Sequence, residues 1–431
     1  MSHHSGFRLR RKGAFRTHTA AGGRFLRWYK NCVLGIAMGA IYTNLAIYCY
    51  VLNPAMLPKF IFFGLFLIFS PLLITNKRDL VPYLLSPFFL WAMLLLILNV
   101  IHLAAFSTTS TVSGLDLIDQ QGEARRSLVV TRSQYILFAI IFGFVPYATT
   151  GRKYLYPIVL LMILVPCAVI LDFTHPGLLY PTETEGAVLG RAAAMFINPT
   201  MAGEAVLHIF LLGCMLTRMH YRLPFFILAG AAVLSTFSRS SIIAWVLIFF
   251  ILVWKRTLPR SAVIVTAIIV GIFLVFLGSF ESYIQSRQDF ESAFSNILSR
   301  LDFFSSFKLN DDSSEERADV IRAAWELFLQ NPFFGAGAGA TQFWSYRAST
   351  HNQILLLAAE YGLFGIGLWI WMIVILWKGN FFTDRGLQLA MVFLFAFMSL
   401  FTHQMFDSAS YWLATFALLS TRENIAGRAG S

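Results

Sequence analysis

The chain has 431 residues, of which 57% are hydrophobic and 13% carry a charge, and its net charge is +11. A soluble domain carries about 25% charged residues, so this composition excludes a water-soluble enzyme, a disordered chain and a coiled coil. The apolar runs are continuous rather than alternating, which argues against a membrane β-barrel. We therefore expect an all-α, polytopic integral membrane protein.

The first 30 residues form a basic tail that contains eight lysines and arginines and no acid. Cytoplasmic segments of membrane proteins carry an excess of Lys and Arg. Residues 1–30 are therefore interpreted as a cytoplasmic tail close to anionic headgroups. A nucleic-acid interface needs a folded basic face, which the tail does not offer, so we expect no nucleic-acid partner.

Twelve apolar runs follow the tail, and we interpret them as transmembrane helices, which need about 20 residues each. The runs lie near 31–52, 59–75, 80–106, 133–149, 154–172, 204–217, 221–236, 240–254, 261–280, 353–377, 386–403 and 409–421. We expect nine spans within 31–280, a periplasmic loop at 281–352, three spans within 353–421 and a cytoplasmic tail at 422–431. Because twelve is even, both termini are predicted on the cytoplasmic side.

The connections between the runs follow the positive-inside rule. Every segment assigned to the cytoplasm carries at least two basic residues, as at Lys255 and Arg256. The segments assigned to the outer side are 53–58, 107–132, 173–203, 236–240, 281–352 and 404–408. The alternation of charge therefore predicts which end of the helix bundle faces outward.

The sequence of the long outer loop predicts an amphipathic helix. A Ser-x-x-Glu capping box begins at Ser313, and a stripe of residues follows at helical spacing, namely Ile321, Ala324, Trp325 and Phe328. Asn331 and Pro332 end the pattern. We expect an amphipathic helix over 315–330 that lies on the outer face, against the bundle or against the lipid headgroups.

The outer segments carry many arginines and a single lysine, Lys308. The arginines are Arg125, Arg126, Arg132, Arg191, Arg239, Arg287, Arg300, Arg317, Arg322 and Arg347. Arginine binds phosphate bidentately and stays ionised, so the cluster indicates an anionic, lipid-linked substrate. The alternative for each arginine is contact with lipid headgroups or pairing with acids of the loop.

Three of these arginines have settings that favour anion binding. Arg239 lies in a Ser-Arg-Ser-Ser sequence at the start of an apolar helix, where free backbone N–H groups favour an anion. Arg191 precedes Asn198 and Pro199, which break the entry to the next span. Arg317 lies in the first turn of the amphipathic helix, on the face of Ala324, and we expect it to point inward.

His351 is the candidate general base. It precedes Asn352 at the start of an apolar helix on the arginine-bearing side, and a neutral imidazole accepts a proton from a hydroxyl. Glu360 is a rival, but it lies nine residues further on the opposite helix face, so we interpret it as buried packing or gating chemistry. The other histidines of the spans, His102, His208 and His403, have no comparable neighbours in the sequence.

Motifs for nucleotides and metals are absent from the sequence. There is no phosphate-binding loop of the Gly-x-x-x-x-Gly-Lys type, and the glycines of 335–339 follow no strand. No spacing of His, Cys or carboxylates suits a metal. We therefore expect no metal and no cofactor. A transfer reaction without them requires a donor that is already activated, such as a lipid-linked pyrophosphate sugar.

Several spaced motifs resemble one known family. They are Arg317, Trp325, the runs 331–337, 351–355 and 360–365, the serine–arginine run 235–240 and the segment 190–199. Together they resemble the core signature of the bacterial O-antigen ligase and polymerase superfamily. The resemblance covers about 190–370 and leaves the N-terminal half matched in hydropathy alone.

The resemblance implies a GT-C-like glycosyltransferase of the bacterial inner membrane that takes a glycan from undecaprenyl pyrophosphate at the periplasmic face. By that likeness, Arg191, Arg239 and Arg317 bind the pyrophosphate leaving group. His351 deprotonates or orients the acceptor hydroxyl, with Arg317 as its catalytic partner. The supporting residues are Asn198 and Asn352. The displacement is expected to be inverting and metal-free.

The superfamily contains ligases, whose acceptor is lipid A–core, and polymerases, whose acceptor is another lipid-linked repeat unit. We favour an O-antigen ligase, because the compact chain lacks room for a soluble acceptor-binding domain. We expect the enzyme to be a monomer. The alternative is an O-antigen or exopolysaccharide polymerase with the same donor. A transporter or flippase would have midplane charges and inverted repeats, and the sequence pattern has neither.

Overall fold

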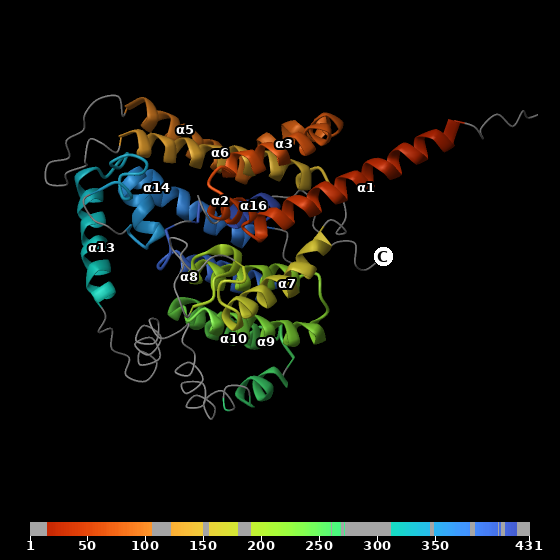
Figure 1. Cartoon of the computed structure of the whole chain (residues 1–431). Helices are drawn as coiled ribbons and strands as arrows, with labels where there is room; N and C mark the ends of the chain where they lie inside the picture. The colour runs from red at the N-terminus through yellow and green to blue at the C-terminus, as the bar shows by residue number, and fades with distance from the viewer. Residues whose placement is uncertain are drawn as a thin grey trace, which may run out of the picture.

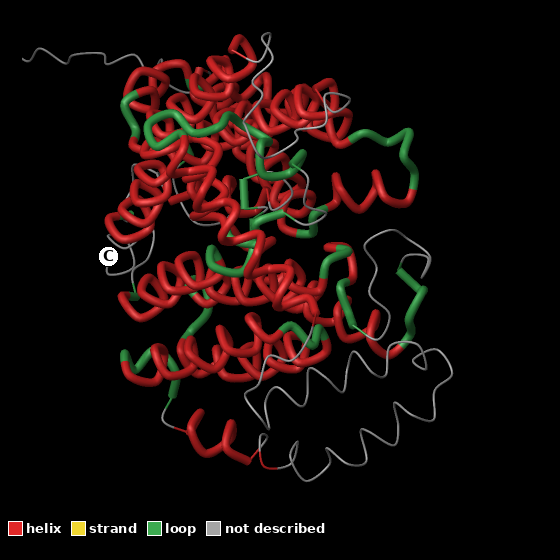
Figure 2. The backbone as a smooth tube through the Cα atoms, turned by 90° about the vertical axis from the view of Figure 1, so that its left-hand side faces the viewer, coloured by secondary structure: helices red, strands yellow, loops and turns green. Residues whose placement is uncertain are grey.

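The computed structural model describes residues 15–105, 122–149, 155–179, 191–259, 261–268, 271, 312–344, 349–379, 384–403, 405–406 and 410–419. In these residues every regular element is a helix and no strand occurs (Figure 2). The all-α prediction is therefore confirmed for the described part of the chain.

The helices follow the predicted apolar runs closely. In chain order they are α1 (Phe15–Tyr42), α2 (Leu45–Leu52), α3 (Pro58–Thr75), η1 (Lys77–Asp79), α4 (Leu80–Leu84), α5 (Pro87–Ala105), α6 (Gly122–Tyr147), α7 (Tyr156–Thr174), η4 (Ala194–Phe196), α8 (Pro199–Cys214), α9 (Met219–Ser235), α10 (Arg239–Trp254), α13 (Asp312–Gln330), α14 (Gln353–Lys378), α15 (Arg385–Met398) and α16 (Ser410–Leu419). The predicted run 261–280 lies mostly outside the described residues.

Several of these helices are long and apolar enough to cross a bilayer. Among the described residues, α3, α5, α6, α7 and α14 meet this condition, and the pair α1 and α2, bent by 58°, makes a sixth span if counted as one. The apolar helices α8, α9, α10, α15 and α16 are shorter, at 10–17 residues. The chain is thus a multi-pass membrane protein by length and composition, and the number of twelve spans stays a prediction.

The helices are arranged in layers (Figure 1). Helices α3, α5 and α6 form one layer, α7 to α10 form another, and α14 and α16 lie between them. Helix α13 stands across one end of the bundle, and α1 extends beyond the opposite end. The bundle therefore has two distinct ends.

Hydrogen bonds at both ends of α15 fix the relative directions of the central helices. Just before α15, Asp384 pairs with Arg222 at 2.6 Å and accepts a hydrogen bond from Thr257, which follows α10. At the other end of α15, the carbonyl of Ser399 accepts a hydrogen bond from the backbone N–H of Gln353, the first residue of α14. Helices α10 and α14 consequently begin at the end of the bundle where α15 finishes.

The remaining helices place their polar termini at this same end. His102 near the end of α5 and Arg125 near the start of α6 both bond to the loop that precedes α14. Helix α8 begins beside the start of α10, because Ser238 donates a hydrogen bond to Thr200. We call this the loop end of the bundle. It carries the described residues of 122–132, 191–203, 236–240 and 331–352, which the charge alternation assigns to the outer side.

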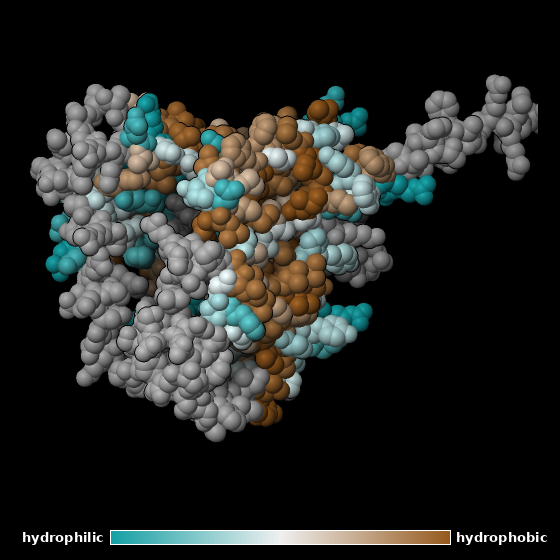
Figure 3. Space-filling model, viewed as in Figure 1, coloured by the Kyte–Doolittle hydropathy of each residue, from teal (hydrophilic) through white to brown (hydrophobic). Residues whose placement is uncertain are grey.

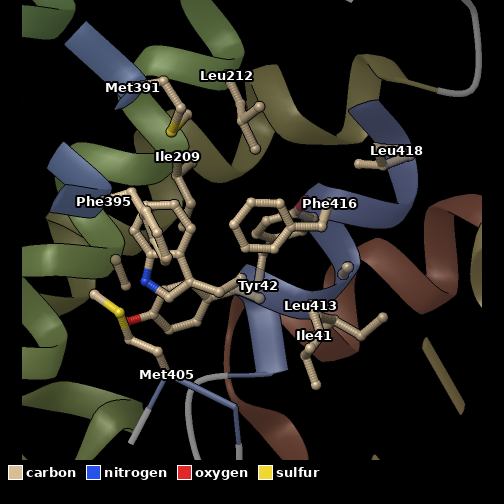
Figure 4. Packing of buried hydrophobic residues seen from close by; sticks show 14 of the residues in the cluster. Ile41, Tyr42, Ile209, Leu212, Met391, Phe395, Met405, Leu413, Phe416 and Leu418 are labelled. Atoms are coloured by element: carbon tan, nitrogen blue, oxygen red, sulfur yellow. The ribbon is translucent and has the colours of Figure 1, made fainter. Parts of the chain in front are cut away.

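Helix α16 forms the centre of the hydrophobic core. All of its residues are buried, as expected for a helix that is apolar on every side. Trp412 and Phe416 pack against Phe395 of α15, with ring centroids 5.1 and 5.4 Å apart. Residues of α1, α8 and α15 surround the helix, including Ile41, Tyr42, Ile209, Leu212 and Met391 (Figure 4).

Two polar residues of α8 are buried beside α16. Glu204 accepts a hydrogen bond from the indole of Trp412. His208 lies 2.7 Å from the hydroxyl of Thr415, which also lies 2.8 Å from the hydroxyl of Tyr42. Thr415 of α16 and Tyr42 of α1 thus bring hydroxyl groups to the surroundings of His208. These contacts satisfy polar groups that would be costly to bury alone.

The outward faces of the bundle are strongly apolar. Large side chains such as Phe63 and Ile74 of α3 are 61% and 75% exposed. Similar side chains are exposed on α5, α7, α10 and α14, and Figure 3 shows several large brown areas on the face in view. Contiguous apolar surface of this extent marks contact with another apolar phase, which for these helices is the lipid.

Helix α13 confirms the predicted amphipathic helix and shows which of its residues face the bundle. Its buried residues are Val320, Ala323, Ala324, Leu327 and Phe328, whereas Ile321 and Trp325 are 41% and 48% exposed. Of the stripe, Ala324 and Phe328 therefore face the bundle, whereas Ile321 and Trp325 do not. The reason is that α13 packs against Ala340, Trp344 and Ala359, a surface that the sequence pattern of one helix does not reveal.

Candidate functional site

The turn between α9 and α10 presents a helix N-terminus and a guanidinium together at the loop end. The hydroxyl oxygen of Ser238 caps α10, accepting hydrogen bonds from the backbone N–H of Ser241 at 3.5 Å and from its hydroxyl at 3.0 Å. Arg239 is the first residue of α10 and is half-buried. The positive helix end and the arginine both favour an anion at this turn.

Arg191 lies against the same turn. Its Nε donates a hydrogen bond to the carbonyl of Thr236 at 3.1 Å, and the next residue, Ala192, donates its backbone N–H to the carbonyl of Ser235 at 3.1 Å. The structure therefore brings Arg191 and Arg239 to one turn, although they come from separate segments. Two guanidiniums at a helix start form a setting suited to a phosphate group.

Asn198 anchors the start of α8 beside this turn. Its side-chain oxygen accepts hydrogen bonds from the backbone N–H groups of Thr200 at 2.8 Å and Met201 at 3.4 Å. A Cβ at Gly203 would lie 2.5 Å from the hydroxyl oxygen of Ser241, so only glycine allows α8 and α10 to begin this close together. Asn198 thus supports the turn through the fold.

Asp172, at the end of α7, is a site residue that sequence reasoning missed. Its Oδ2 accepts hydrogen bonds from the backbone N–H groups of Ala193 and Ala194, both at 2.8 Å. These bonds hold the segment that follows Arg191, in which Ala194 and Ile197 have φ of 46° and 65°, a region that non-glycine residues rarely adopt. The only signal in the sequence was an acid at the end of an apolar run.

His351 lies just before α14, facing a second histidine. Asn352 caps the helix by accepting a hydrogen bond from the backbone N–H of Leu355 at 3.0 Å. The ring of His351 stands at 83° to the ring of His403, with centroids 4.9 Å apart. The sequence around His403 does not indicate this contact, which depends on how α14 and α15 pack. Burial lowers the pKa of His403, so this histidine is neutral at pH 7.

A buried ion pair lies behind the two histidines. Nη1 of Arg132 on α6 is 2.6 Å from Oε2 of Glu360 on α14, and the hydroxyl of Thr341 donates to Oε1 of Glu360 at 2.8 Å. Arg132 was grouped with the outer arginines, and its partner could not be named from the sequence. The pair neutralises both charges inside the bundle, as buried charges require.

Arg125 and His102 hold the loop between α13 and α14. Arg125 donates from Nε to the carbonyl of Ala338 and from Nη2 to the carbonyl of Ala336, both at 2.9 Å. Nδ1 of His102 accepts from the backbone N–H of Ala338 at 3.0 Å, and its Nε2 lies 3.2 Å from the carbonyl of Phe334. These contacts of His102 join segments more than 200 residues apart, so the sequence does not indicate them. Both side chains fix the loop rather than face a ligand.

This loop inserts into a break in α14. Gly362 has φ 64° and ψ −144°, which interrupts the helix, and the backbone N–H of Leu363 bonds instead to the carbonyl of Pro332. The backbone N–H of Gly337 donates to the carbonyl of Glu360 at 3.0 Å. The loop therefore determines where Glu360 is held.

A small cavity lies between His403 and Arg132. It has a volume of about 10 Å³, which is close to the room that one water molecule needs. Its polar lining comes from Asn99, Arg132, Gln353, Tyr361 and His403. The cavity therefore connects the surroundings of His403 with one member of the buried ion pair.

Arg317 is the predicted site residue that the structure does not place fully. Its backbone belongs to α13, and its side chain lies outside the described residues. Whether Arg317 converges with Arg191 and Arg239 therefore stays a prediction. The described part of the chain also contains no group of three or more His, Cys, Asp or Glu side chains that could hold a metal ion, and a metal-free reaction likewise stays a prediction.

Residues 224–370 match the family model of the O-antigen ligases. This segment, about a third of the chain, is similar to the O-antigen ligases. The resemblance seen in the sequence is thereby confirmed, and no curated protein matches the chain. The family indicates a membrane glycosyltransferase of the ligase or polymerase type that acts on lipid-linked glycans.

The O-antigen ligase segment contains Arg239, His351 and Glu360, and the fold adds groups to it from outside. Arg132 and Arg191 both precede residue 224, yet they contact Glu360 and Thr236 within the segment. The candidate site is therefore assembled by the whole helix bundle. Its parts are the turn of Arg191 and Arg239, the histidine at the start of α14 and the buried ion pair, and all of them lie at the loop end.

Proposed function

We propose that the protein is an O-antigen ligase, which transfers a glycan from undecaprenyl pyrophosphate to a sugar hydroxyl of lipid A–core. The observation that carries this proposal is that Arg191 meets the turn of Arg239 at the start of α10, partly within the family segment. A lipid-linked pyrophosphate is the anion that such a turn would hold beside a membrane. The donor supplies its own activation, so neither a nucleotide nor a metal is required.

The pyrophosphate group is the part of the donor that these residues would bind. Negative charge develops on the leaving pyrophosphate as the bond to the sugar breaks, and fixed cationic groups stabilise that charge without reorganising. Arg191 and Arg239 would bind it together with the N–H groups at the start of α10. Arg317 would complete the binding from α13.

His351 would act on the acceptor. The acceptor hydroxyl oxygen attacks the anomeric carbon, while the bond between that carbon and the phosphate oxygen breaks and its electron pair leaves with the pyrophosphate. The hydroxyl proton passes to His351, whose neutral imidazole can accept it. Attack from the face opposite the leaving group inverts the anomeric configuration. Asn352 would keep His351 in place by capping α14.

The orientation in the membrane follows from charge. We propose that the loop end faces the periplasm, with 281–352 as its long loop, and that the basic tails 1–30 and 422–431 lie in the cytoplasm. The spans would then be nine in 31–280 and three in 353–421, in the bacterial inner membrane. We propose that the enzyme works as a monomer.

The lipopolysaccharide of a deletion strain tests this function directly. Loss of a ligase leaves core-only lipopolysaccharide and lets long lipid-linked glycan accumulate. Loss of a polymerase leaves core with one repeat unit, and loss of a flippase retains single repeats inside the cell. A gel pattern of core with one repeat unit would contradict the ligase function and support the polymerase function. Reconstitution with purified donor and lipid A–core should then give the transfer product.

A further inference from the structure

His403 connects the proposed base to the interior of the bundle. It lies between α15 and α16, and its ring is edge-to-face with His351 at 4.9 Å. The residue as a whole is partly exposed, but its Nδ1 is buried and has no hydrogen-bond partner among the described residues. A buried ring nitrogen of this kind calls for a partner, because burying a polar group without one costs free energy.

The cavity beside His403 offers a place for that partner. Its volume of about 10 Å³ suits one water molecule, which needs about two to four polar groups around it. The guanidinium-bearing side chain of Arg132 and the side chains of Asn99 and Gln353 line the cavity with His403. A dry cavity is typical of a purely apolar lining, which this one does not have.

We propose that His403 is a positioning residue for His351, and that a buried water molecule links its Nδ1 to Arg132 and hence to Glu360. The inference rests on the proposed function, because it gives His351 the role of base. Arg132 is held by Glu360 at 2.6 Å, and Glu360 is held by Thr341 at 2.8 Å. The water would therefore join His403 to a rigid buried framework.

The role of His403 is positioning and not proton acceptance. Burial lowers its pKa and the nearby charge of Arg132 acts in the same direction, so the ring stays neutral while His351 takes the acceptor proton. A group that fixes the orientation of a catalytic imidazole affects the rate through geometry, since small misplacements of reacting groups reduce turnover strongly. The effect of losing it is expected in kcat rather than in KM.

Two substitutions separate hydrogen bonding from packing. His403→Phe keeps an aromatic ring and removes the ring nitrogens, whereas His403→Asn loses the ring and keeps a polar atom near the position of Nδ1. We expect the phenylalanine variant to lose about 10- to 100-fold in kcat with KM nearly unchanged, and the asparagine variant to retain more activity. A role in packing alone would reverse this order and would overturn the proposal.

The matched control is His220→Phe. His220 is exposed at the start of α9, at the opposite end of the bundle, and its replacement should leave transfer unchanged. Membrane abundance and melting in detergent are measured for each variant. If the wild-type enzyme catalyses transfer and His403→Phe has the same turnover, this inference alone is contradicted. If the wild-type enzyme does not catalyse transfer, the proposed function is contradicted.

A density map provides a test that needs neither activity nor a variant. In a high-resolution map of the wild-type protein, we expect a water molecule within hydrogen-bond distance of Nδ1 of His403. Density for that water would support the link to Arg132 even if a variant failed to fold. A clearly resolved cavity without water would overturn it.

Discussion

Nη1 of Arg132 lies 2.6 Å from Oε2 of Glu360, and the two side chains are 6% and 0% exposed. They are separated by 228 positions in the chain, so the pair joins α6 to α14 across the bundle. Each charge is costly to bury alone, and their mutual attraction with the bond from Thr341 offsets that cost. The pair thereby fixes α6 and α14 relative to each other at the loop end.

Removing one partner of this pair should destabilise the protein strongly. Glu360→Ala leaves the charge of Arg132 buried without its carboxylate, and breaking a buried pair in this way costs about 3–5 kcal/mol. Thermal unfolding in detergent measures the loss. Glu326→Ala is the control, because Glu326 is exposed on α13, and it should change little. Equal stability of the two variants would show that the pair does not hold the bundle together.

The double variant Arg132→Met with Glu360→Met gives a further check of the same pair. Replacing a whole buried ion pair by apolar side chains is often neutral. We therefore expect the double variant to melt above Glu360→Ala. A double variant that is as unstable as the sum of both single changes would indicate that the two residues act independently.

The helix positions could be predicted from the sequence, because each follows from a local property. Apolar runs gave the helices, and the capping residues Asn198, Ser238 and Asn352 gave three of their starts. These features depend on short-range hydrogen bonding and hydrophobicity, which are visible in a single segment. The convergence of Arg191, Arg239 and Arg317 on one anion stays a prediction, although Arg191 does bond to the turn that precedes Arg239.

The contacts between distant segments could not be predicted. The partner of Glu360, the histidine that faces His351 and the role of Asp172 all depend on how helices pack, and nothing in a single segment specifies this. The exposure of Ile321 on α13 has the same cause, since Ala340 and Trp344 supply the surface on which α13 packs.

Gly362 should be essential to the fold of α14. Its φ of 64° and ψ of −144° do not suit an L-residue, and an added Cβ would lie 2.4 Å from the carbonyl carbon of Phe333. Gly362→Ala should therefore lower stability by at least about 1–3 kcal/mol. Gly367→Ala is the matched control in the same helix, because nothing lies within 4 Å of its Cβ, and it should be neutral or stabilising by up to about 1 kcal/mol. Melting of both variants in detergent checks the contrast.

His351→Ala should abolish glycan transfer while the protein still inserts and folds. The imidazole is the group proposed to take the acceptor proton, and no other described histidine occupies its place at the start of α14. Transfer is measured with purified enzyme, alongside membrane abundance and melting temperature. Activity near the wild-type level would remove His351 from the mechanism.

Activity should survive EDTA and should not require ATP. The sequence offers neither a phosphate-binding loop nor a metal-ligand spacing, and a lipid-linked pyrophosphate donor carries its own activation. The assay uses purified enzyme, donor and acceptor with and without chelator. Loss of activity that magnesium or manganese restores would reveal a metal requirement.

The arginines at the loop end should differ in their tolerance of lysine. Lysine keeps the charge but lacks the planar fork that binds phosphate through two hydrogen bonds. Arg191→Lys, Arg239→Lys and Arg317→Lys should therefore lower turnover substantially, and the alanine variants should lower it further. Removing one donor from a preorganised anion site costs about 3 kcal/mol, or roughly a hundredfold or more in rate.

Arg287 and Arg300 provide the comparison for these variants. Both belong to the long loop and are assigned to surface pairing, so Arg287→Lys and Arg300→Lys should have little effect on turnover. The measurement is kcat with saturating donor for all five variants, together with membrane abundance. If all five positions tolerate lysine equally, the arginines do not form one pyrophosphate site. A structure with donor bound in which Arg317 points away from Arg191 and Arg239 would lead to the same conclusion, because a shared leaving group requires their guanidiniums to converge.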